Sequence, residues 1–263
     1  MIVGVLQLLS KELYIQAKPV EAWGITNVCV SAGFQGCGFG RKLMEGALKI
    51  LSKRGKPLLL LFARRAVDGF YDKFGFIGTG FFPEIAVKNV CSLRPEIVSS
   101  LDFVSRPRPK LRREYSSLYA KTYSKIDFSF YRDVRWWQNV DNWLKFVLKD
   151  HEFVNVYLNG RFTGYFIRKD NRVIEAAAAG DYGLFSELIA AYFVNNKNSE
   201  LSFELMPAHP LAKKLFLLNH DFKCRRSWDG GHMLRFNVPS RLSKFRLVRL
   251  ADSSHAWSVV DEF

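Results

Sequence analysis

The chain has 263 residues, of which 48% are hydrophobic and 15% aromatic, and its formal net charge is +14. Its length suits two modest domains, and its composition is that of a globular chain with ample apolar material for a core. The positive charge favours an anionic partner, which leaves nucleic acid, a membrane surface and a phosphorylated cofactor open. The four cysteines form no CxxC pair and have no histidine at zinc-ligand spacing, so neither a disulfide framework nor a metal site is expected.

The N-terminal segment lacks the basic region and small-residue cleavage pattern of a signal peptide. The longest apolar run, PLLLLFA at 57–63, is far below the roughly 20 residues that a membrane-spanning helix needs. We therefore expect a cytoplasmic protein with reduced thiols and no membrane span.

The first half of the chain reads as strands at 2–8, 12–17 and 22–30, then a glycine-rich loop and a helix over about 39–54. Gly55 and Pro57 are typical of a helix C-terminus, PLLLLF reads as a buried strand, and a short helix is expected around 66–74. This order predicts an α/β fold with a mixed sheet and at least one parallel strand pair.

The segment SRPRPKLRRE at 105–114 reads as a linker between two domains. Helices are expected at 111–124 and 130–149, followed by strands at 152–158 and 162–168 that the Asn159-Gly160 turn joins into a hairpin. The remaining expected elements are a strand at 172–179, a helix at 183–195, a strand at 201–205, a helix at 209–219 and a strand at 231–237. The second half thus repeats the order of the first with two helices added in front. We expect domains at 1–104 and 105–240 and a tail at 241–263.

Four glycines, at positions 33, 36, 38 and 40, stand directly before the first helix. A helix N-terminus exposes unpaired N–H groups and binds phosphates, and glycine lets the backbone approach a ligand closely. The pattern is not the dinucleotide fingerprint, since position 41 is Arg, nor a P-loop, since no GK[ST] follows. On the glycines alone, a tight turn without a ligand is an equally good interpretation.

The surrounding residues favour a cofactor. The run from Gln35 to Gly40, followed by Arg41, resembles the acetyl-CoA loop of the GNAT superfamily of N-acyltransferases, and GFYDKFGF at 69–76 resembles that family's second motif. The resemblance implies that the strand before the loop holds the pantetheine arm through Val28, Cys29 and Val30. It also implies that backbone N–H groups of seven loop residues hold the pyrophosphate: Gln35, Gly36, Cys37, Gly38, Phe39, Gly40 and Arg41.

Tyr71 matches the tyrosine that protonates the leaving thiolate in this family. Its alternative role is that of a core aromatic residue. Two positions depart from the family pattern: Arg64 replaces a common Asn, and Ser31-Ala32 replaces a common Pro.

The second half resembles a GNAT copy without a cofactor loop, because residues 180–184 read GDYGL. Such a tandem is similar to the enhanced-intracellular-survival group of acetyltransferases, which acylate amines on small molecules or proteins. RDVRWW at 132–137 and GGHMLRF at 230–236 are similar to segments there. That group has a third, sterol-carrier-like domain whose terminal carboxylate is a base, and this chain is too short for it, so the role is not assigned to Phe263.

The tail at 244–263 resembles the opening strand and helix that the first copy lacks, with Ala256, Val259, Val260 and Phe263 on one helical face. We interpret this as a circular permutation in which the tail completes the first domain. A hairpin that closes the second domain, or a truncated reading frame, are the alternatives.

The expected function is acyl transfer from acetyl-CoA to a small-molecule or protein amine through a ternary complex. Glu21 and Asn27 are candidate positions for a base, and neither the five histidines nor the tryptophans at 136, 137 and 143 stand in a catalytic pattern. Alternatives are a non-catalytic acyl-CoA-binding or interaction module, an aminoacyl-transfer enzyme and a nucleic-acid binder. The last rests on the net charge and the basic segment at 105–114, and the sequence contains no RRM, KH or zinc motif to support it. The acceptor and the oligomeric state stay open.

Overall fold

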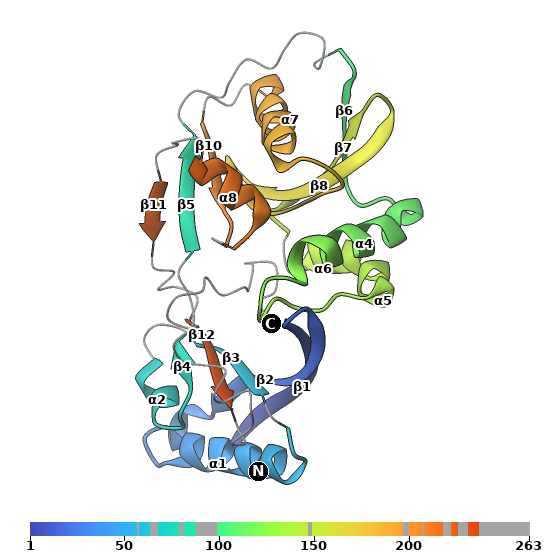
Figure 1. Ribbon diagram of the computed structural model, residues 1–263. Coiled ribbons are helices and arrows are strands. Elements are labelled where there is room, and N and C mark those ends of the chain that lie inside the picture. Colours follow the sequence, from blue (N-terminus) through green and yellow to red (C-terminus); the bar gives the residue numbers. More distant parts are fainter. Residues whose placement is uncertain are drawn as a thin grey trace.

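The computed structural model describes residues 1–56, 58–63, 68–78, 82–87, 99–146, 149–196, 200–206, 208–217, 222–225 and 231–236. These residues form two units, each built on a mixed β-sheet with helices against it, and the two units lie one above the other in Figure 1. The expected mixed α/β fold is confirmed. The tail at 244–263 and Arg64 lie outside the described residues.

The first sheet has the order β1-β2-β3-β12-β4. Its strands are β1 (Gly4–Ile15), β2 (Lys18–Val30), β3 (Leu58–Ala63), β12 (Gly231–Phe236) and β4 (Ile77–Gly78). β1 and β2 form one long antiparallel hairpin that turns at Gln16-Ala17, so the prediction of separate strands at 2–8 and 12–17 is wrong. Residues 10–12 continue the ladder because they pair with residues 21–23 of β2. The expected parallel pair is present between β2 and β3.

The second sheet has the order β11-β5-β10-β9-β8-β7-β6. Its strands are β11 (Phe222–Arg225), β5 (Phe82–Val87), β10 (Leu201–Glu204), β9 (Arg172–Ala178), β8 (Arg161–Lys169), β7 (Glu152–Leu158) and β6 (Leu101–Ser105). Asn159 and Gly160 join β7 to β8 with φ values of 53° and 69°, as a two-residue turn of this sequence requires, so the predicted hairpin is confirmed. β9 and β10 are parallel, like β2 and β3 in the first sheet.

The described helices are α1 (Phe39–Lys53), α2 (Asp68–Asp72), α4 (Arg112–Tyr123), α5 (Val134–Gln138), α6 (Val140–Phe146), α7 (Tyr182–Asn195) and α8 (Pro210–Leu217), with 3-10 turns η1 (Ala32–Phe34) and η3 (Pro109–Leu111). The single helix predicted at 130–149 is wrong. Asp133 starts α5 by accepting a hydrogen bond from Trp136 N at 2.8 Å, and Asn139 ends it. The predicted linker is also wrong, since Ser105 ends β6 and Pro107 is buried.

Strands from one part of the chain lie in the sheet of the other: β5 and β6, from the first 105 residues, belong to the second sheet, and β12 belongs to the first. β5 pairs with β10 and β11 in the second sheet, and β12 pairs with β3 and β4 in the first. Figure 1 shows this exchange by colour, with the teal β5 in the upper sheet and the orange-brown β12 in the lower one. Neither sheet is therefore made from one continuous half of the chain.

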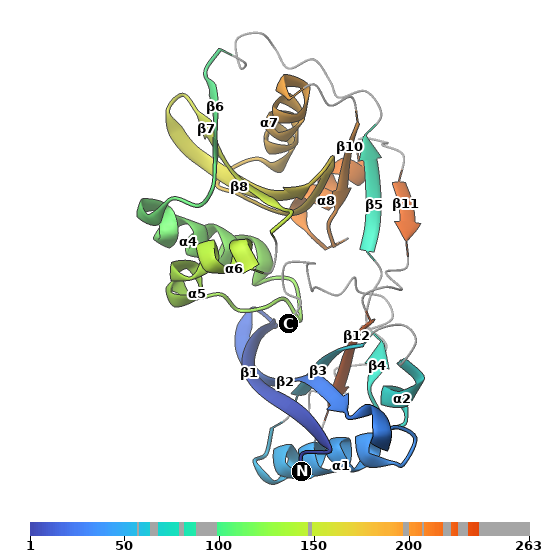
Figure 2. The same ribbon diagram turned by 180° about the vertical axis from the view of Figure 1, so that it is seen from behind.

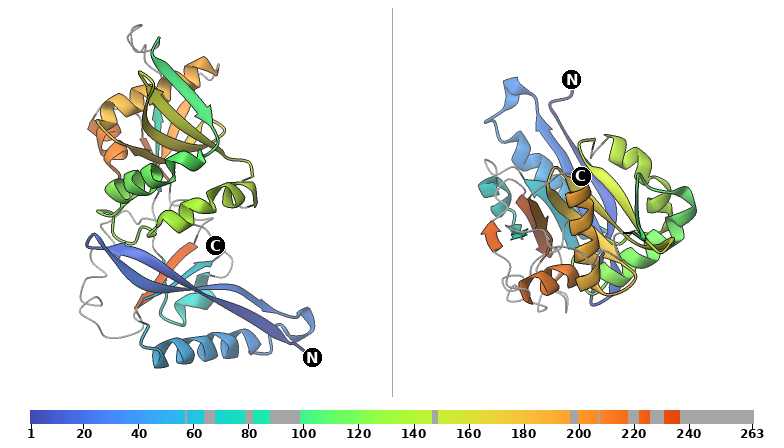
Figure 3. Two further views of the ribbon diagram at one scale, coloured as in Figure 1. Left: turned by 90° about the vertical axis from the view of Figure 1, so that its right-hand side faces the viewer. Right: turned by 90° about the horizontal axis from the view of Figure 1, so that it is seen from above.

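The two units share a hydrophobic core. Leu13, Ala22 and Leu60 of the first sheet pack with Tyr115 and Trp137 of the second unit in one buried cluster. Figure 2 shows α4, α5 and α6 between the second sheet and the β1–β2 hairpin. Figure 3 (left) shows α1 on the side of the hairpin that is turned away from the second unit. This packing leaves the N-terminal end of α1 outside the contact between the units.

Candidate functional site

β2 and β3 separate before the glycine loop is reached. They pair only from Trp23 to Ile25, opposite residues 59–61, while β2 continues to Val30. Just after the paired stretch Asn27 has a φ of 53°, the β1–β2 register shifts by one residue, and the Asn27 Nδ2 donates to Gln7 Oε1 at 2.8 Å. Residues 26–30 therefore have backbone groups that no longer pair with β3, which suits them to bind an extended ligand.

The glycine loop connects this strand to α1. Gln35 Nε2 donates to the Val30 carbonyl oxygen at 3.1 Å and ties the loop to the strand end. Gly36 and Gly38 have φ values of 79° and 81°, and an added Cβ would meet no atom within 4 Å at either position. Glycine is thus required there by the left-handed backbone conformation and not by lack of space.

Gly38 is the N-cap of α1, and no side chain caps the helix. The Lys42 N–H makes the first helical bond, to the Gly38 carbonyl oxygen at 3.1 Å. The N–H groups of residues 39–41 accordingly have no acceptor within the helix. The first turn contains no acid and contains Arg41, which adds positive charge to the positive end of the helix dipole. These features together form an anion-binding position.

A cavity of about 530 Å³ joins the two sequence motifs. The described residues that line it are Val28, Val30, Phe34, Gln35, Gly36, Gly38, Phe39, Gly40, Arg41, Phe70 and Tyr71. Eight of the ten expected cofactor positions and the expected catalytic tyrosine therefore meet at one cavity. Cys29 and Cys37 are exposed and do not line it. Phe34, next to the first motif, and Phe70, inside the second, were not predicted as site residues, since an aromatic residue at such a position looks like any core residue in the sequence.

Tyr71 lies half-buried on α2, with its ring 5.1 Å from that of Phe70 and 6.4 Å from that of Phe76. Burial raises the pKa of its hydroxyl above the usual 10, and the nearby Cys29 raises it further. No described residue accepts a hydrogen bond from this hydroxyl. It is therefore protonated at neutral pH and able to donate to a ligand.

The two candidate bases lie elsewhere. Glu21 binds Lys56 Nζ at 2.7 and 2.8 Å, and this hydrogen bond is the main cause that lowers the pKa of the carboxyl group. Glu21 also lines a different cavity, with Glu12 and Tyr131, and Asn27 is engaged with Gln7. The described lining of the 530 Å³ cavity contains no Asp, Glu or His.

The equivalent position in the second unit is occupied by the protein's own side chains. Asp181 caps α7 by accepting from Leu184 N at 2.8 Å, which places a carboxylate where a phosphate would otherwise bind. On the preceding strand, the Ala176 carbonyl oxygen accepts from His209 Nε2 at 2.9 Å and from the Tyr123 hydroxyl at 3.4 Å. The second copy therefore has no cofactor loop, as the sequence predicted.

The described part of the chain shows neither a membrane-spanning helix nor a metal-binding group of side chains. Its helices include none that is long and apolar enough to cross a membrane. Its His, Cys, Asp and Glu side chains form no group of three or more that could hold a metal ion.

The first part of the chain matches a known protein family. The sequence model of the acetyltransferase (GNAT) domain matches residues 1–78, which include the loop and Tyr71. No sequence among the curated proteins matches the chain.

Solved structures share the fold of about nine-tenths of the chain. The GCN5-related N-acetyltransferase from Kribbella flavida is 18% identical, with a TM-score of 0.64 over 89% of this chain and 57% of its own. The GCN5-related N-acetyltransferase from Anabaena variabilis ATCC 29413 is 18% identical, with a TM-score of 0.65 over 90% of this chain and 60% of its own. Eis1 from Mycobacterium abscessus is 15% identical, with a TM-score of 0.61 over 90% of this chain and 62% of its own.

The chain thus spans about 60% of the length of the structures that it matches. Residues 1–78 match a GNAT acetyltransferase domain, and the chain has the mixed α/β fold of the GNAT N-acetyltransferases, similar to that of the tandem protein Eis1.

Proposed function

We propose that this chain transfers an acetyl group from acetyl-CoA to an amine of a small molecule or a protein, with both substrates bound in a ternary complex. The observation that supports the proposal is that one cavity is lined both by the uncapped start of α1 and by Tyr71. A phosphate site alone would support only binding, and a buried tyrosine alone would be a packing residue. Their meeting at one cavity supports group transfer.

The residues present fit acetyl-CoA. The unpaired N–H groups at the start of α1 and the positive side chain of Arg41 suit a pyrophosphate. A basic first turn opposes the helix dipole by about 0.3–1 kcal/mol per charge, and a bound anion would offset that cost. The unpaired edge of β2 at Val28, Cys29 and Val30 suits the amide groups of a pantetheine arm.

When bound, acetyl-CoA supplies a thioester carbonyl that an amine can attack. The new C–N bond would form as the C–S bond breaks, and Tyr71 would give the proton of its hydroxyl to the departing sulfur. The attacking nitrogen would release one proton to solvent as it becomes an amide, and the Tyr71 phenolate would regain one from solvent. The raised pKa of this hydroxyl keeps that proton in place throughout the neutral range. Tyr71 is therefore proposed as the general acid.

The acceptor must lose a proton without help from the described wall of the cavity, which lacks carboxylates and imidazoles. A lysine-like amine with a pKa near 10.4 is neutral only about once in a few thousand molecules at pH 7. We therefore propose that the neutral amine is selected from solution, which makes the reaction faster as the pH rises.

The test is a calorimetric titration with acetyl-CoA of three proteins: the wild type, Gly40→Glu and Gly46→Glu. Both glycines lie in α1 and both substitutions add one negative charge, but only Gly40 lines the cavity. A Cβ at Gly40 would lie 3.6 Å from the Phe70 ring, an ordinary contact, and one at Gly46 meets no atom within 4 Å. Neither position needs a left-handed backbone, so these variants are cleaner than substitutions at Gly36 or Gly38.

The wild type and Gly46→Glu are expected to bind acetyl-CoA with micromolar affinity, while Gly40→Glu loses about tenfold or more because like charges meet at the phosphate position. Equal affinity in all three proteins, or no binding by the wild type, would overturn the proposal. Binding without thiol release across a panel of amines would identify the chain as an acyl-CoA-binding module instead.

A further inference from the structure

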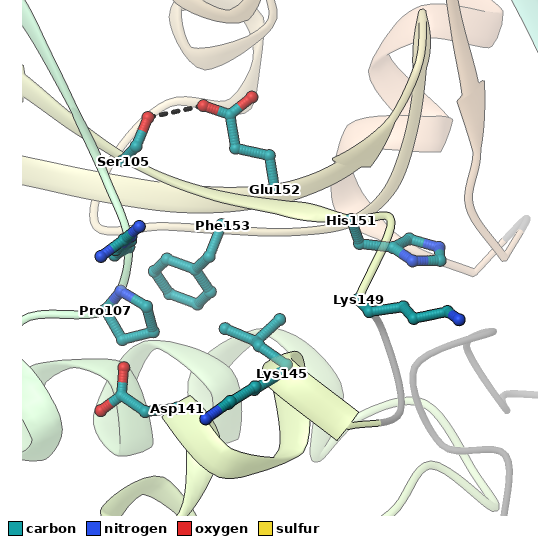
Figure 4. Close-up of a pocket in the computed structure, with 10 residues that line it drawn as sticks. Ser105, Pro107, Asp141, Lys145, Lys149, His151, Glu152 and Phe153 are labelled. Atoms are coloured by element: carbon teal, nitrogen blue, oxygen red, sulfur yellow. Dashed lines mark hydrogen bonds between the residues drawn. The ribbon is translucent and has the colours of Figure 1, made fainter.

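A second cavity, of about 630 Å³, lies in the second unit among the end of β6, the start of β7 and α6. Its apolar part is formed by Pro107, Leu144 and Phe153, of which Phe153 is 2% exposed. Figure 4 shows the Phe153 ring directed between Pro107 and the α6 side of the cavity. This volume lies within the usual range of small-molecule sites, about 300–1,000 Å³.

The rim of this cavity carries an excess of positive charge. Arg106, Lys145 and Lys149 are part of its lining, together with His151. The two carboxylates in the lining are each near an arginine outside it, Asp141 at 3.9 Å from Arg112 and Glu152 at 2.7 Å from Arg168.

Glu152 is turned away from the apolar part of the cavity. Its Oε1 accepts from Ser105 Oγ at 2.5 Å, and its Oε2 accepts from the Tyr192 hydroxyl at 2.9 Å. Figure 4 shows the carboxylate of Glu152 directed toward Ser105, on the opposite side of the strand from Phe153. The carboxylate of Glu152 is therefore engaged by Ser105, Tyr192 and Arg168, none of which is a cation of the cavity rim.

Arg106 has a strained backbone, with a φ of 76°, which side chains with a Cβ rarely adopt. The conformation is held from inside the protein: the Arg106 N–H donates to the Phe153 carbonyl oxygen at 2.8 Å, and Asn155 Nδ2 donates to the Arg106 carbonyl oxygen at 2.7 Å. Asn155 is fully buried and accepts a hydrogen bond from the Tyr115 hydroxyl. A buried polar network thus fixes a strained cationic residue at the rim of a cavity, and such strain is typical of ligand sites.

We propose that this cavity binds a small organic anion, with an apolar or aromatic body against Pro107, Leu144 and Phe153 and an acidic group near Arg106 and Lys149. The acidic group can be a phosphate, a sulfonate or a carboxylate, since all three carry the charge that the rim attracts. The described linings of this cavity and of the acetyl-CoA cavity have no residue in common, so the proposal does not depend on the acetyl transfer.

The test is a fluorescence titration of the full chain with 8-anilinonaphthalene-1-sulfonate, an aromatic anion. Arg106→Gly removes the charge and keeps the backbone conformation, because glycine adopts a positive φ without strain. Lys149→Glu reverses an exposed charge at the rim. Lys49→Glu makes the same charge change on an exposed position of α1 and serves as the matched control. Thermal melts of all variants establish that they are folded.

Saturable binding by the wild type and Lys49→Glu, with affinity about tenfold lower in Arg106→Gly and Lys149→Glu, supports the site. Inorganic phosphate should compete only weakly, since it lacks the apolar body. The proposed anion site would be overturned by any of three results: no saturable binding of the probe, equal affinity in all variants, or displacement of the probe by acetyl-CoA. Acetyl-CoA titrations of the same variants should match the wild type, which separates failure of this site from failure of the proposed transfer.

Discussion

Tyr71 combines two properties that a general acid needs: its hydroxyl has no hydrogen-bond acceptor among the described residues, and burial holds its pKa above 10. We expect Tyr71→Phe to lower kcat by about 10²–10⁴ while the affinity for acetyl-CoA is unchanged. The measurement is thiol release at saturating acetyl-CoA, together with a calorimetric titration.

The pH dependence of the wild type follows from the same geometry. Because no described residue of the cavity wall is a base, kcat/KM should rise with pH as the acceptor amine deprotonates, and should fall only above pH 10, where Tyr71 ionises. A Tyr71→Phe variant with full activity, or a wild-type rate that is constant between pH 6 and pH 8, would contradict these assignments.

His209 is fully buried, and burial lowers its pKa to about 4, although its hydrogen bond to the Ala176 carbonyl oxygen acts in the opposite direction. Its Nδ1 accepts from Leu211 N at 3.1 Å, so the neutral ring holds the start of α8. The unfolded chain binds a proton near pH 6.5, and the folded chain does so only near pH 4. The contribution of the neutral His209 to the free energy of unfolding is therefore fully present above pH 6.5. It is lost as the pH falls toward 4, and it amounts to at most about 3 kcal/mol.

Substitution of this residue tests the linkage. His209→Asn keeps an acceptor for Leu211 N but does not titrate, so its free energy of unfolding should change less than that of the wild type between pH 6.5 and pH 4. Urea denaturation at several pH values measures both proteins. Parallel pH dependences would show that His209 is not the group that titrates.

The contacts of some single residues could not be predicted from the sequence. Arg132 and Glu175, both fully buried, form an ion pair at 2.8 Å although they are 43 positions apart. Each charge is satisfied only because folding brings the other to it, and no local pattern reports such a partner. The tryptophan at 137, for which the sequence showed no catalytic pattern, is buried in the core.

Among the helices and strands, those with a local sequence signal were predicted correctly. The hairpin at Asn159-Gly160 and helix α1 were predicted because their turn and periodicity are encoded in adjacent residues. Strands β4, β5, β6 and β11 were missed, since they have two to six residues each and become strands through their partners. The predicted helix at 130–149 was wrong because Asp133 starts a new helix inside it.

Helices α1 and α7 each follow a strand that has a parallel neighbour, but their N-termini differ. α1 starts at a left-handed glycine with no side-chain cap, whereas α7 starts at Asp181, which fills its own N-terminus with a carboxylate. An exposed helix start can hold an anion, and a capped one cannot. This contrast was visible in the sequence, since GDYGL lacks the glycine spacing of residues 36–40.

The whole molecule is held together by the shared core and by the exchange of β5 and β12. Because β12 lies inside the first sheet, the chain that follows Phe236 starts from that sheet. Residues 244–263 lie outside the described residues, so the circular permutation stays a proposal.

Deletion of residues 244–263 tests the permutation. If the tail completes the first domain, the deletion should lower the Tm and abolish acetyl-CoA binding, because the first sheet loses its covering elements. The measurement is a thermal melt with a parallel acetyl-CoA titration, and Val259→Asp with Val260→Asp on the predicted apolar face gives the matched point-mutant control. An unchanged melt with intact binding would contradict the permutation.

The sequence by itself determined helix α1, the Asn159-Gly160 hairpin, the glycine loop and the place of Tyr71 after it, because each depends on residues that are neighbours along the chain. Only the tertiary structure decided that β5 lies in the second sheet and β12 in the first. It alone also decided that Tyr123 and His209 bind the Ala176 carbonyl oxygen of β9, and that Arg106, with a positive φ, lines a separate cavity. These features depend on contacts between residues far apart in the chain, and the free energy of such contacts exists only in the folded protein.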